Sequence, residues 1–252
     1  MTERKHPGES TLERLIAIFD VAPADCGRDP GTTSFTGDSD GGGRNVVDGS
    51  QILAQSLVAA SKALPGRTVR SAHALFVAAA HPAKQLEFTV TPVRAGRSFA
   101  SAIVTVGQGD RTCVTATVLL DNPQPDVIRH DKYTGPATDG PNAAHPAAMH
   151  LPGRQLRIEG IRDHNSPDEL GPPVLDAWLH YDTMPERDDL RRALLAHFTG
   201  HLSISTTFRA HQGIGTAQAH HTVSTASFTQ DAMIRALDPN STSAALPAES
   251  RL

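Results

Sequence analysis

Cysteine is scarce in this sequence, which contains only Cys26 and Cys113. Two isolated thiols without CxxC spacing provide neither a zinc site nor a disulfide framework. Free thiols of this kind suit a reducing compartment, so we expect a cytoplasmic protein. Cys113 lies in a strand-like stretch and is better explained as a small buried apolar residue than as a nucleophile.

Long hydrophobic runs and an excess of basic charge are also missing. No apolar run approaches the ~20 residues that span a bilayer, and residues 1–10 lack the apolar segment of a signal peptide. The net charge of -4 argues against a nucleic-acid-binding protein, which would carry a basic stripe. Aromatic residues make up only 4%, and Ala, Thr and Val supply most of the apolar mass. Such small residues suit a closely packed sheet and a buried helix.

Two common catalytic motifs are either absent or lack their structural context. The GxSxG pattern occurs at Gly37–Gly41, inside a stretch that is predicted to be a loop, so the strand–turn–helix elbow of an α/β-hydrolase is not expected there. The glycine run Gly41–Gly43 is not followed by GK[ST], so it is not a P-loop.

A buried helix is predicted from about Asp48 to Ala63, ending before Pro65-Gly66. Apolar residues cover most of its circumference: Ile52, Leu53, Ala54, Leu57, Val58, Ala59, Ala60 and Ala63. A helix that is apolar nearly all round is a buried helix. A shorter helix begins at Ser10, which has capping-box spacing to Glu13, and residues 21–43 are predicted to be a loop.

Strand-like stretches separated by turn signals follow the buried helix. They cover 68–79, 86–93, 98–106 and 112–120, with short turns that are typical of an antiparallel meander. One helix followed by such strands predicts an α+β unit in which a curved sheet wraps the helix. This first unit covers residues 10–122.

The pattern partly repeats after a Pro-rich linker at residues 123–152. Strands are predicted at 155–162 and 174–181, a helix at 188–198 capped by Asp188 or Asp189, and further strands at 202–208, 215–225 and 227–237. This second unit covers residues 153–237, and the polar tail 238–252 is expected to be disordered. The order of elements therefore indicates two related halves.

Several segments together resemble the type II acyl-CoA thioesterases. In the first half they are Gly42-Gly43-Arg44, Gln51–Ala60, His73–Phe76, Arg94–Ala100 and Gln108-Gly109-Asp110; in the second half they are Leu194–His197 and Ser227–Arg235. The resemblance implies a double hot-dog fold, in which two helices are each wrapped by a curved antiparallel sheet. It also implies hydrolysis of acyl-CoA to a fatty acid and CoA by an oriented water, with no metal, cofactor or covalent intermediate.

The family's catalytic groups are an Asp, a Thr or Ser, and a Gln. The resemblance assigns the Gln to Gln230 and the Thr to Thr222, whereas the Asp position falls on Gly200. The family also has further strands between the Thr motif and the Gln strand, but here Ala226 runs directly into Ser227. Either the chain carries an internal deletion, or its second sheet is incomplete and exposes unpaired strand edges.

Each candidate residue also has a simpler explanation. Thr222 and Gln230 could be ordinary strand residues, since strands are rich in Thr. His201, beside the vacant Asp position, could be a general base or a surface residue near a helix-ending Gly200. A metal alternative pairs His197 with His201, with His211, His220 and His221 downstream, but the HExxH core is absent and Gly200 is expected to end the helix.

Substrate contacts are expected from the first half. The N-terminus of the buried helix at Gly49 could hold the thioester oxygen or a phosphate, His73 lies on the following strand, and Arg97 in the hairpin could contact CoA phosphates or simply be solvated. We therefore expect an acyl-CoA thioesterase that uses Thr222, Gln230 and His201 and forms homo-oligomers. The alternative is a catalytically impaired hot-dog protein that binds acyl-CoA or a protein partner.

Overall fold

The computed structural model describes residues 11–24, 30–124, 141–147, 151–160, 170–171, 174–208, 229–232 and 244–251, and their side chains up to residue 200 except 174 and 175. The chain forms two compact units, 1–127 with 185–197 and 128–184 with 198–252. The helices are α1 (Leu12–Phe19), α2 (Gly49–Ala63) and α3 (Asp188–Phe208). The strands are β1 (Ala22–Ala24), β2 (Thr33–Gly37), β3 (Thr68–Phe76), β4 (Leu86–Ala95), β5 (Phe99–Gln108), β6 (Arg111–Asp121), β7 (His145–Pro146), β8 (Arg154–Ile158), β9 (Val174–Tyr181), β10 (Thr229–Ala232) and β11 (Ala244–Arg251).

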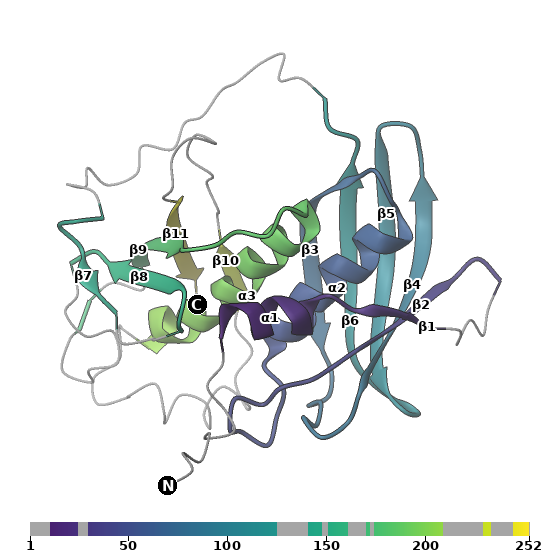
Figure 1. Cartoon of the computed structure of the whole chain (residues 1–252), viewed down its shortest axis with the longest axis horizontal. Coiled ribbons are helices and arrows are strands. Elements are labelled where there is room, and N and C mark those ends of the chain that lie inside the picture. Colours follow the sequence, from purple (N-terminus) through teal and green to yellow (C-terminus); the bar gives the residue numbers. More distant parts are fainter. Residues whose placement is uncertain are drawn as a thin grey trace, which may run out of the picture. The chain divides into compact units, whose positions relative to one another are not determined.

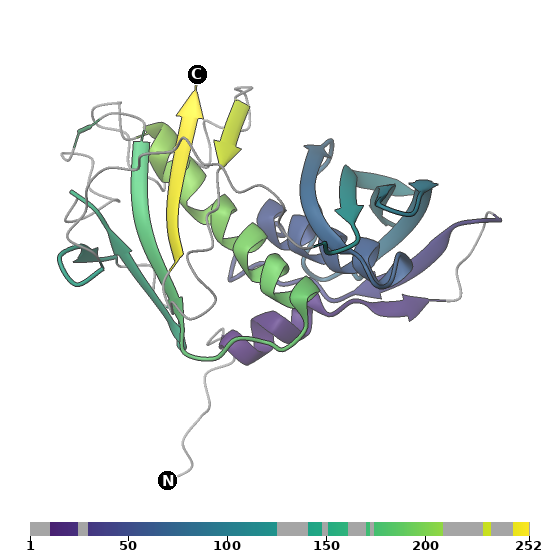
Figure 2. The ribbon, with the colours of Figure 1, turned by 90° about the horizontal axis from the view of Figure 1, so that it is seen from above.

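Helix α2 is the core of the first unit, as its all-round apolar pattern predicts. It contacts α1 and strands β2 to β6, and Figures 1 and 2 show the sheet curling around it. Asp48 caps the helix, and its carboxylate accepts a hydrogen bond from the Ser50 amide. Ala54, Val58 and Ala59 are fully buried. The small side chains let the curved sheet approach the helix closely.

The first sheet has the strand order β1-β2-β4-β5-β6-β3, with antiparallel pairing throughout. The meander prediction is right for β4, β5 and β6 but wrong for β3. That strand pairs with β6, where His73 lies opposite Thr117, and not with β4. Strands β1 and β2 were also missed, because residues 21–43 were predicted to be a loop.

Side chains alternate between the two faces of the first sheet. On β4, Phe88 and Val90 are buried while Thr89 is half-buried, and on β5 Val104 and Val106 are buried. The buried set faces α2, so the threonines line the opposite face. Cys113 on β6 is fully buried, as expected of a small apolar residue.

Three helices of the first unit meet in a network of charges. The Asp20 carboxylate at the C-cap of α1 lies 2.6 Å from Lys62 Nζ on α2 and 2.9 Å from Arg187 Nη1, just before α3. Arg187 also contacts the Asp189 carboxylate at 2.6 Å. Partial burial acts to raise the pKa of Asp20, but hydrogen bonds and charges from Lys62 and Arg187 outweigh it and lower that pKa. At the other end of α1, the capping side chain is Thr11 rather than the predicted Ser10.

The second unit contains an antiparallel sheet with the order β10-β11-β9-β8-β7. Strand β11 lies between β9 and β10, so the expectation of a disordered tail at 238–252 is wrong for residues 244–251. Strand β7 falls within the predicted linker and pairs with β8. The junction between Ala226 and Ser227, where a deletion was inferred, lies outside the described residues.

Helix α3 is longer than predicted and continues through Gly200 to Phe208. Glycine in a helix costs only about 1 kcal/mol relative to alanine, so a single glycine does not by itself end a helix. The prediction that Gly200 ends the helix is therefore wrong, as is the predicted strand at 202–208. Among the helices that the structure describes, none is long and apolar enough to cross a membrane.

Candidate active site

The N-terminus of α2 is formed around Gly49. The amides of Gln51 and Ile52 donate to the Asp48 carbonyl, and Arg44 pairs with the Asp48 carboxylate at 2.8 Å. No described residue accepts a hydrogen bond from the Gly49 amide. This amide is therefore available as a donor at the positive end of the helix dipole.

Phe76 at the end of β3 covers this helix terminus. A Cβ placed on Gly49 would lie 2.9 Å from Phe76 Cε1, which is too close for an unstrained contact. Any larger residue at this position would therefore require the Phe76 ring to shift. Phe76 and its neighbours Leu75 and Val77 are all more than half exposed, so an apolar surface lies beside the free Gly49 amide.

Two buried glutamines of α2 fix the chain segment before the helix. Gln55 is fully buried, and its Nε2 donates to the carbonyls of Ile18 and Asp38 at 2.9 and 2.8 Å. Gln51 Nε2 donates to Gln55 Oε1, and Gln51 Oε1 accepts from the Asp40 amide. These bonds satisfy polar groups that would otherwise be unpaired in the core. The two glutamines are visible in the sequence, but the backbone carbonyls that accept their hydrogen bonds could not be predicted from it.

The predicted substrate contacts Gly49, His73 and Arg97 do not lie in one place. The β3 strand runs from Thr68, near the β4–β5 turn that carries Arg97, to Phe76 beside Gly49. The nine residues of β3 are separated by eight steps that together span about 26 Å, and Figure 1 shows the turn and the start of α2 at opposite ends of the sheet. His73 is exposed part-way along β3.

The predicted catalytic residues belong to the second unit. His201 lies within α3, and Gln230 lies on β10 opposite Ser250 of β11. Thr222 lies outside the described residues. The proximity of the three side chains stays a prediction, as does the role of each.

His197 lies one turn before His201 but is buried, with its ring 5.2 Å from that of Phe19 on α1. In the described part of the chain, no group of three or more His, Cys, Asp or Glu side chains could hold a metal ion. The packing of His197 against Phe19 gives it a structural explanation that the sequence spacing did not suggest.

A buried polar pair in the second unit was not predicted from the sequence. Arg154 on β8 hydrogen-bonds to the Tyr181 hydroxyl on β9 and lies 5.8 Å from the centre of the Phe198 ring. Burial is the largest influence on Tyr181 and raises its pKa to about 12, although Arg154 acts in the opposite direction. Period-two alternation could have placed Arg154 on the buried face, together with Leu156 and Ile158.

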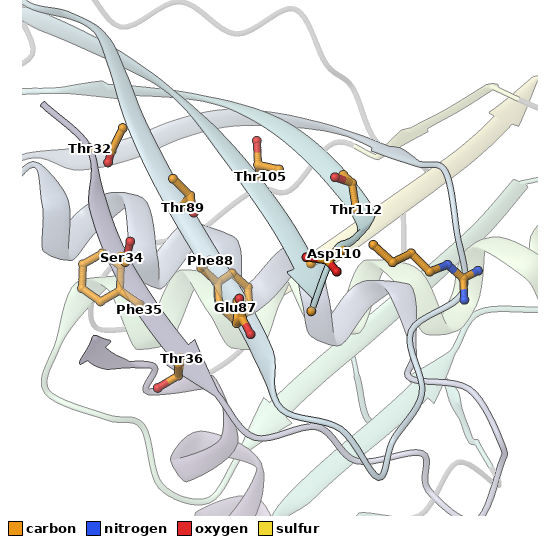
Figure 3. A pocket seen from close by; sticks show the side chains of 13 residues that line it. Thr32, Ser34, Phe35, Thr36, Glu87, Phe88, Thr89, Thr105, Asp110 and Thr112 are labelled. Carbon is orange, nitrogen blue, oxygen red and sulfur yellow. The ribbon is translucent and has the colours of Figure 1, made fainter. Parts of the chain in front are cut away.

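A cavity of about 330 Å³ lies on the face of the first sheet that points away from α2. Ser34, Thr89 and Thr105 are cross-strand neighbours there, with Glu87 and Asp110 nearby (Figure 3). Its hydroxyls and carboxylates could hydrogen-bond a polar molecule. None of the predicted site residues lines it.

Part of the chain matches a known family in a comparison with protein-family models. Residues 38–120, about a third of the chain, match the family model "Acyl-CoA thioesterase N-terminal domain". No curated protein sequence matches the chain.

Two solved structures resemble almost the whole chain. The tesB protein of Mycobacterium avium subsp. paratuberculosis has 17% identity and a TM-score of 0.68, covering 95% of this chain and 98% of its own. The acyl-CoA thioesterase II TesB2 of Mycobacterium marinum has 15% identity and a TM-score of 0.58, covering 94% and 96%. At such low identity these likenesses show the fold. The chain thus has an α+β hot-dog fold, and its residues 38–120 match the N-terminal domain of acyl-CoA thioesterases.

Proposed function

We propose that this protein hydrolyses acyl-CoA thioesters to free fatty acids and CoA through an oriented water. The observation that carries the proposal is the match of residues 38–120 to the acyl-CoA thioesterase N-terminal domain. That segment contains α2 with its free Gly49 amide, and the apolar surface beside it suits an acyl chain.

The proposed reaction needs a water held against the thioester carbonyl. Gln230 and Thr222 orient this water by hydrogen bonds, and His201 accepts its proton as the new C–O bond forms. Backbone amides at a helix N-terminus stabilise the negative charge that develops on the carbonyl oxygen. The C–S bond then breaks, and the CoA thiolate leaves and takes up a proton.

Gly200 determines how His201 could replace the family's Asp. Because α3 continues through both residues, positions 200 and 201 differ by about 100° around the helix axis. Residues 197 and 201 instead share one helical face. A base at position 201 therefore approaches from a different direction than an Asp at position 200, and we expect a low rate.

Gly200 also supports a second candidate function. If no side chain replaces the missing carboxylate, the protein binds acyl-CoA without hydrolysing it. The two candidates differ only in turnover, because both require the acyl-CoA site.

Steady-state release of CoA thiol from a panel of acyl-CoA thioesters tests the proposal. We expect turnover that Gln230→Ala lowers at least tenfold, whereas Gln85→Ala, an exposed glutamine of the first unit, serves as a matched control. Turnover that is insensitive to Gln230→Ala would remove the site assignment. Loss of activity after EDTA treatment would favour the metal alternative instead.

We further propose that the protein is cytoplasmic and assembles as a homo-oligomer. The scarcity of cysteine supports the location. The edge of β3 supports the assembly, because this strand is exposed on both faces and, among the described residues, pairs only with β6. Light scattering coupled to size-exclusion chromatography tests the assembly, and a monomer at micromolar concentration would contradict it.

A further inference from the structure

The turn between β4 and β5 is held rigidly. The Gly96 amide donates to the Phe99 carbonyl at 2.9 Å, and Arg67 Nη2 donates to the Gly96 carbonyl at 3.1 Å. Asn122 adds bonds from its amide to the Ser98 carbonyl and from its side chain to the Arg97 carbonyl. Because these hydrogen bonds fix the backbone of the turn, the Cα–Cβ bonds of its side chains have defined directions.

An apolar surface lies beside this turn. Phe99 is 60% exposed and Leu119 is 39% exposed, and both line a concavity of about 420 Å³. Arg94 and Arg97 line the same concavity. An exposed aromatic ring that shares a concavity with two arginines is unusual, because large apolar side chains are normally buried.

The two arginines carry uncompensated charge. The nearest acid along β6, Asp121, already pairs with Arg70 at 2.7 Å. Within the part of the chain that the structure describes, neither Arg94 nor Arg97 has an acidic partner. Two free cations on a chain of net charge -4 make this end of the sheet a local site for anions.

We propose that this concavity binds the adenosine 3′,5′-bisphosphate end of CoA, an inference that rests on the proposed function. The adenine ring packs on Phe99, while Arg94 and Arg97 form charge-assisted hydrogen bonds to the phosphates. The guanidinium fork suits phosphate oxygens better than a point charge does. A concavity lined by an exposed aromatic ring and two arginines therefore matches a flat base that carries phosphates.

A phospholipid surface presents the same phosphate chemistry, but the turn fits it less well. Residues 96–98 at the tip are Gly, Arg and Ser, whereas insertion into a membrane interface requires apolar residues to enter first. The apolar side chains lie beside the tip and line a concavity, which suits one small ligand.

Calorimetric titration of the full chain with adenosine 3′,5′-bisphosphate tests the proposal directly. We expect the variant Arg94→Ala/Arg97→Ala to bind at least tenfold more weakly, and Phe99→Ala to bind more weakly than the unaltered chain. Arg111→Ala, an exposed arginine on the next hairpin, is the matched control. Equal binding by the double variant and the unaltered chain would overturn the proposal. So would binding to phosphatidylserine vesicles through these arginines without binding of the bisphosphate.

A kinetic comparison separates this proposal from the proposed function. Acyl-CoA and the matching acyl N-acetylcysteamine thioester share the reacting bond, but only the first carries the nucleotide. We expect the double variant to raise KM for acyl-CoA and so bring the two KM values together. A chain that binds the bisphosphate through Arg94 and Arg97 but hydrolyses neither thioester would contradict the proposed function alone. A chain that hydrolyses acyl-CoA with a KM unaffected by the double variant would contradict the inference alone.

Discussion

Replacing Gln55 by alanine should destabilise the first unit strongly. The side-chain amide of Gln55 donates to the Ile18 and Asp38 carbonyls from a fully buried position. Asp38 keeps a longer bond from Gln51 Nε2 at 3.3 Å, whereas Ile18 loses this partner. An unsatisfied buried acceptor costs ~1–3 kcal/mol and the vacated volume adds a cavity term, so we expect a loss of about 2–4 kcal/mol.

Substitution of Gly37, which packs against the Gln55 side chain, is an independent test of the position of Gln55. A Cβ at Gly37 would lie 2.7 Å from Gln55 Nε2, 3.0 Å from Val21 Cγ1 and 3.1 Å from Phe88 Cε2. Gly37→Ala should therefore cost ~1–3 kcal/mol through overpacking. In the double variant Gln55→Ala removes the nearest clash, so the combined loss should be smaller than the sum of the two.

Urea unfolding followed by far-ultraviolet circular dichroism measures both effects. The single tryptophan, Trp178, lies in the second unit, so its fluorescence would not follow the first. Gln85→Ala, an exposed glutamine, should change the free energy of unfolding by less than ~0.5 kcal/mol. If Gln55→Ala behaved like this control, the enclosure of α2 by the sheet would be wrong.

Three further substitutions test the charged residue Arg187, the buried residue Tyr181 and the proposed role of position 200. Arg187→Ala should lower the free energy of unfolding by about 1 kcal/mol or less, because the ion pair with Asp20 is partly exposed. The pKa of Asp20 is lowered in the folded state, so the contribution of its carboxylate to stability should be present above pH ~4 and lost as pH falls further. Urea unfolding of the variant and the unaltered chain at several pH values would measure this difference. Tyr181 should stay neutral up to its pKa of about 12, so its contribution to the stability of the fold should be lost as pH rises from ~10 towards 12. Spectrophotometric titration of the unaltered chain and of Tyr181→Phe identifies the pKa of this tyrosine by difference. An ordinary pKa would contradict its burial beside Arg154. Gly200→Asp should raise the rate of acyl-CoA hydrolysis at least tenfold if only the carboxylate is missing, and no gain would show that the rest of the site is also altered.

The sequence predicted the elements that depend on local pattern. The apolar circumference of residues 48–63 identified α2 to within a residue, and alternation with turn signals located β3 to β6 within a few residues. Strand β2 was missed because Phe35 is the only large apolar residue among Thr, Ser and Gly, so its strand character comes from pairing with β4.

Features that depend on distant contacts were harder to predict. The position of β3 beside β6 is a non-local pairing that turn signals cannot reveal. Gly200 indicated a helix end, but the surrounding helix continues through it. Residues 244–251 contain Pro247 and small side chains, yet form a strand because β9 and β10 supply partners on both sides.

For the candidate site, too, local features could be predicted from the sequence and contacts between distant residues could not. Gly49 at the start of α2 followed from the helix prediction, whereas the covering ring of Phe76 required the fold. The arginines of the β4–β5 turn were visible in the sequence, but their lack of acidic partners among the described residues and their position beside Phe99 were not.

Hydrolysis is tested most directly by a single-turnover experiment with enzyme in excess over a medium-chain acyl-CoA. We expect all bound acyl-CoA to be converted to free fatty acid and CoA thiol, and we expect Gln230→Ala to slow this conversion at least tenfold. Stoichiometric binding of acyl-CoA with no release of thiol would contradict hydrolysis and leave only the binding function.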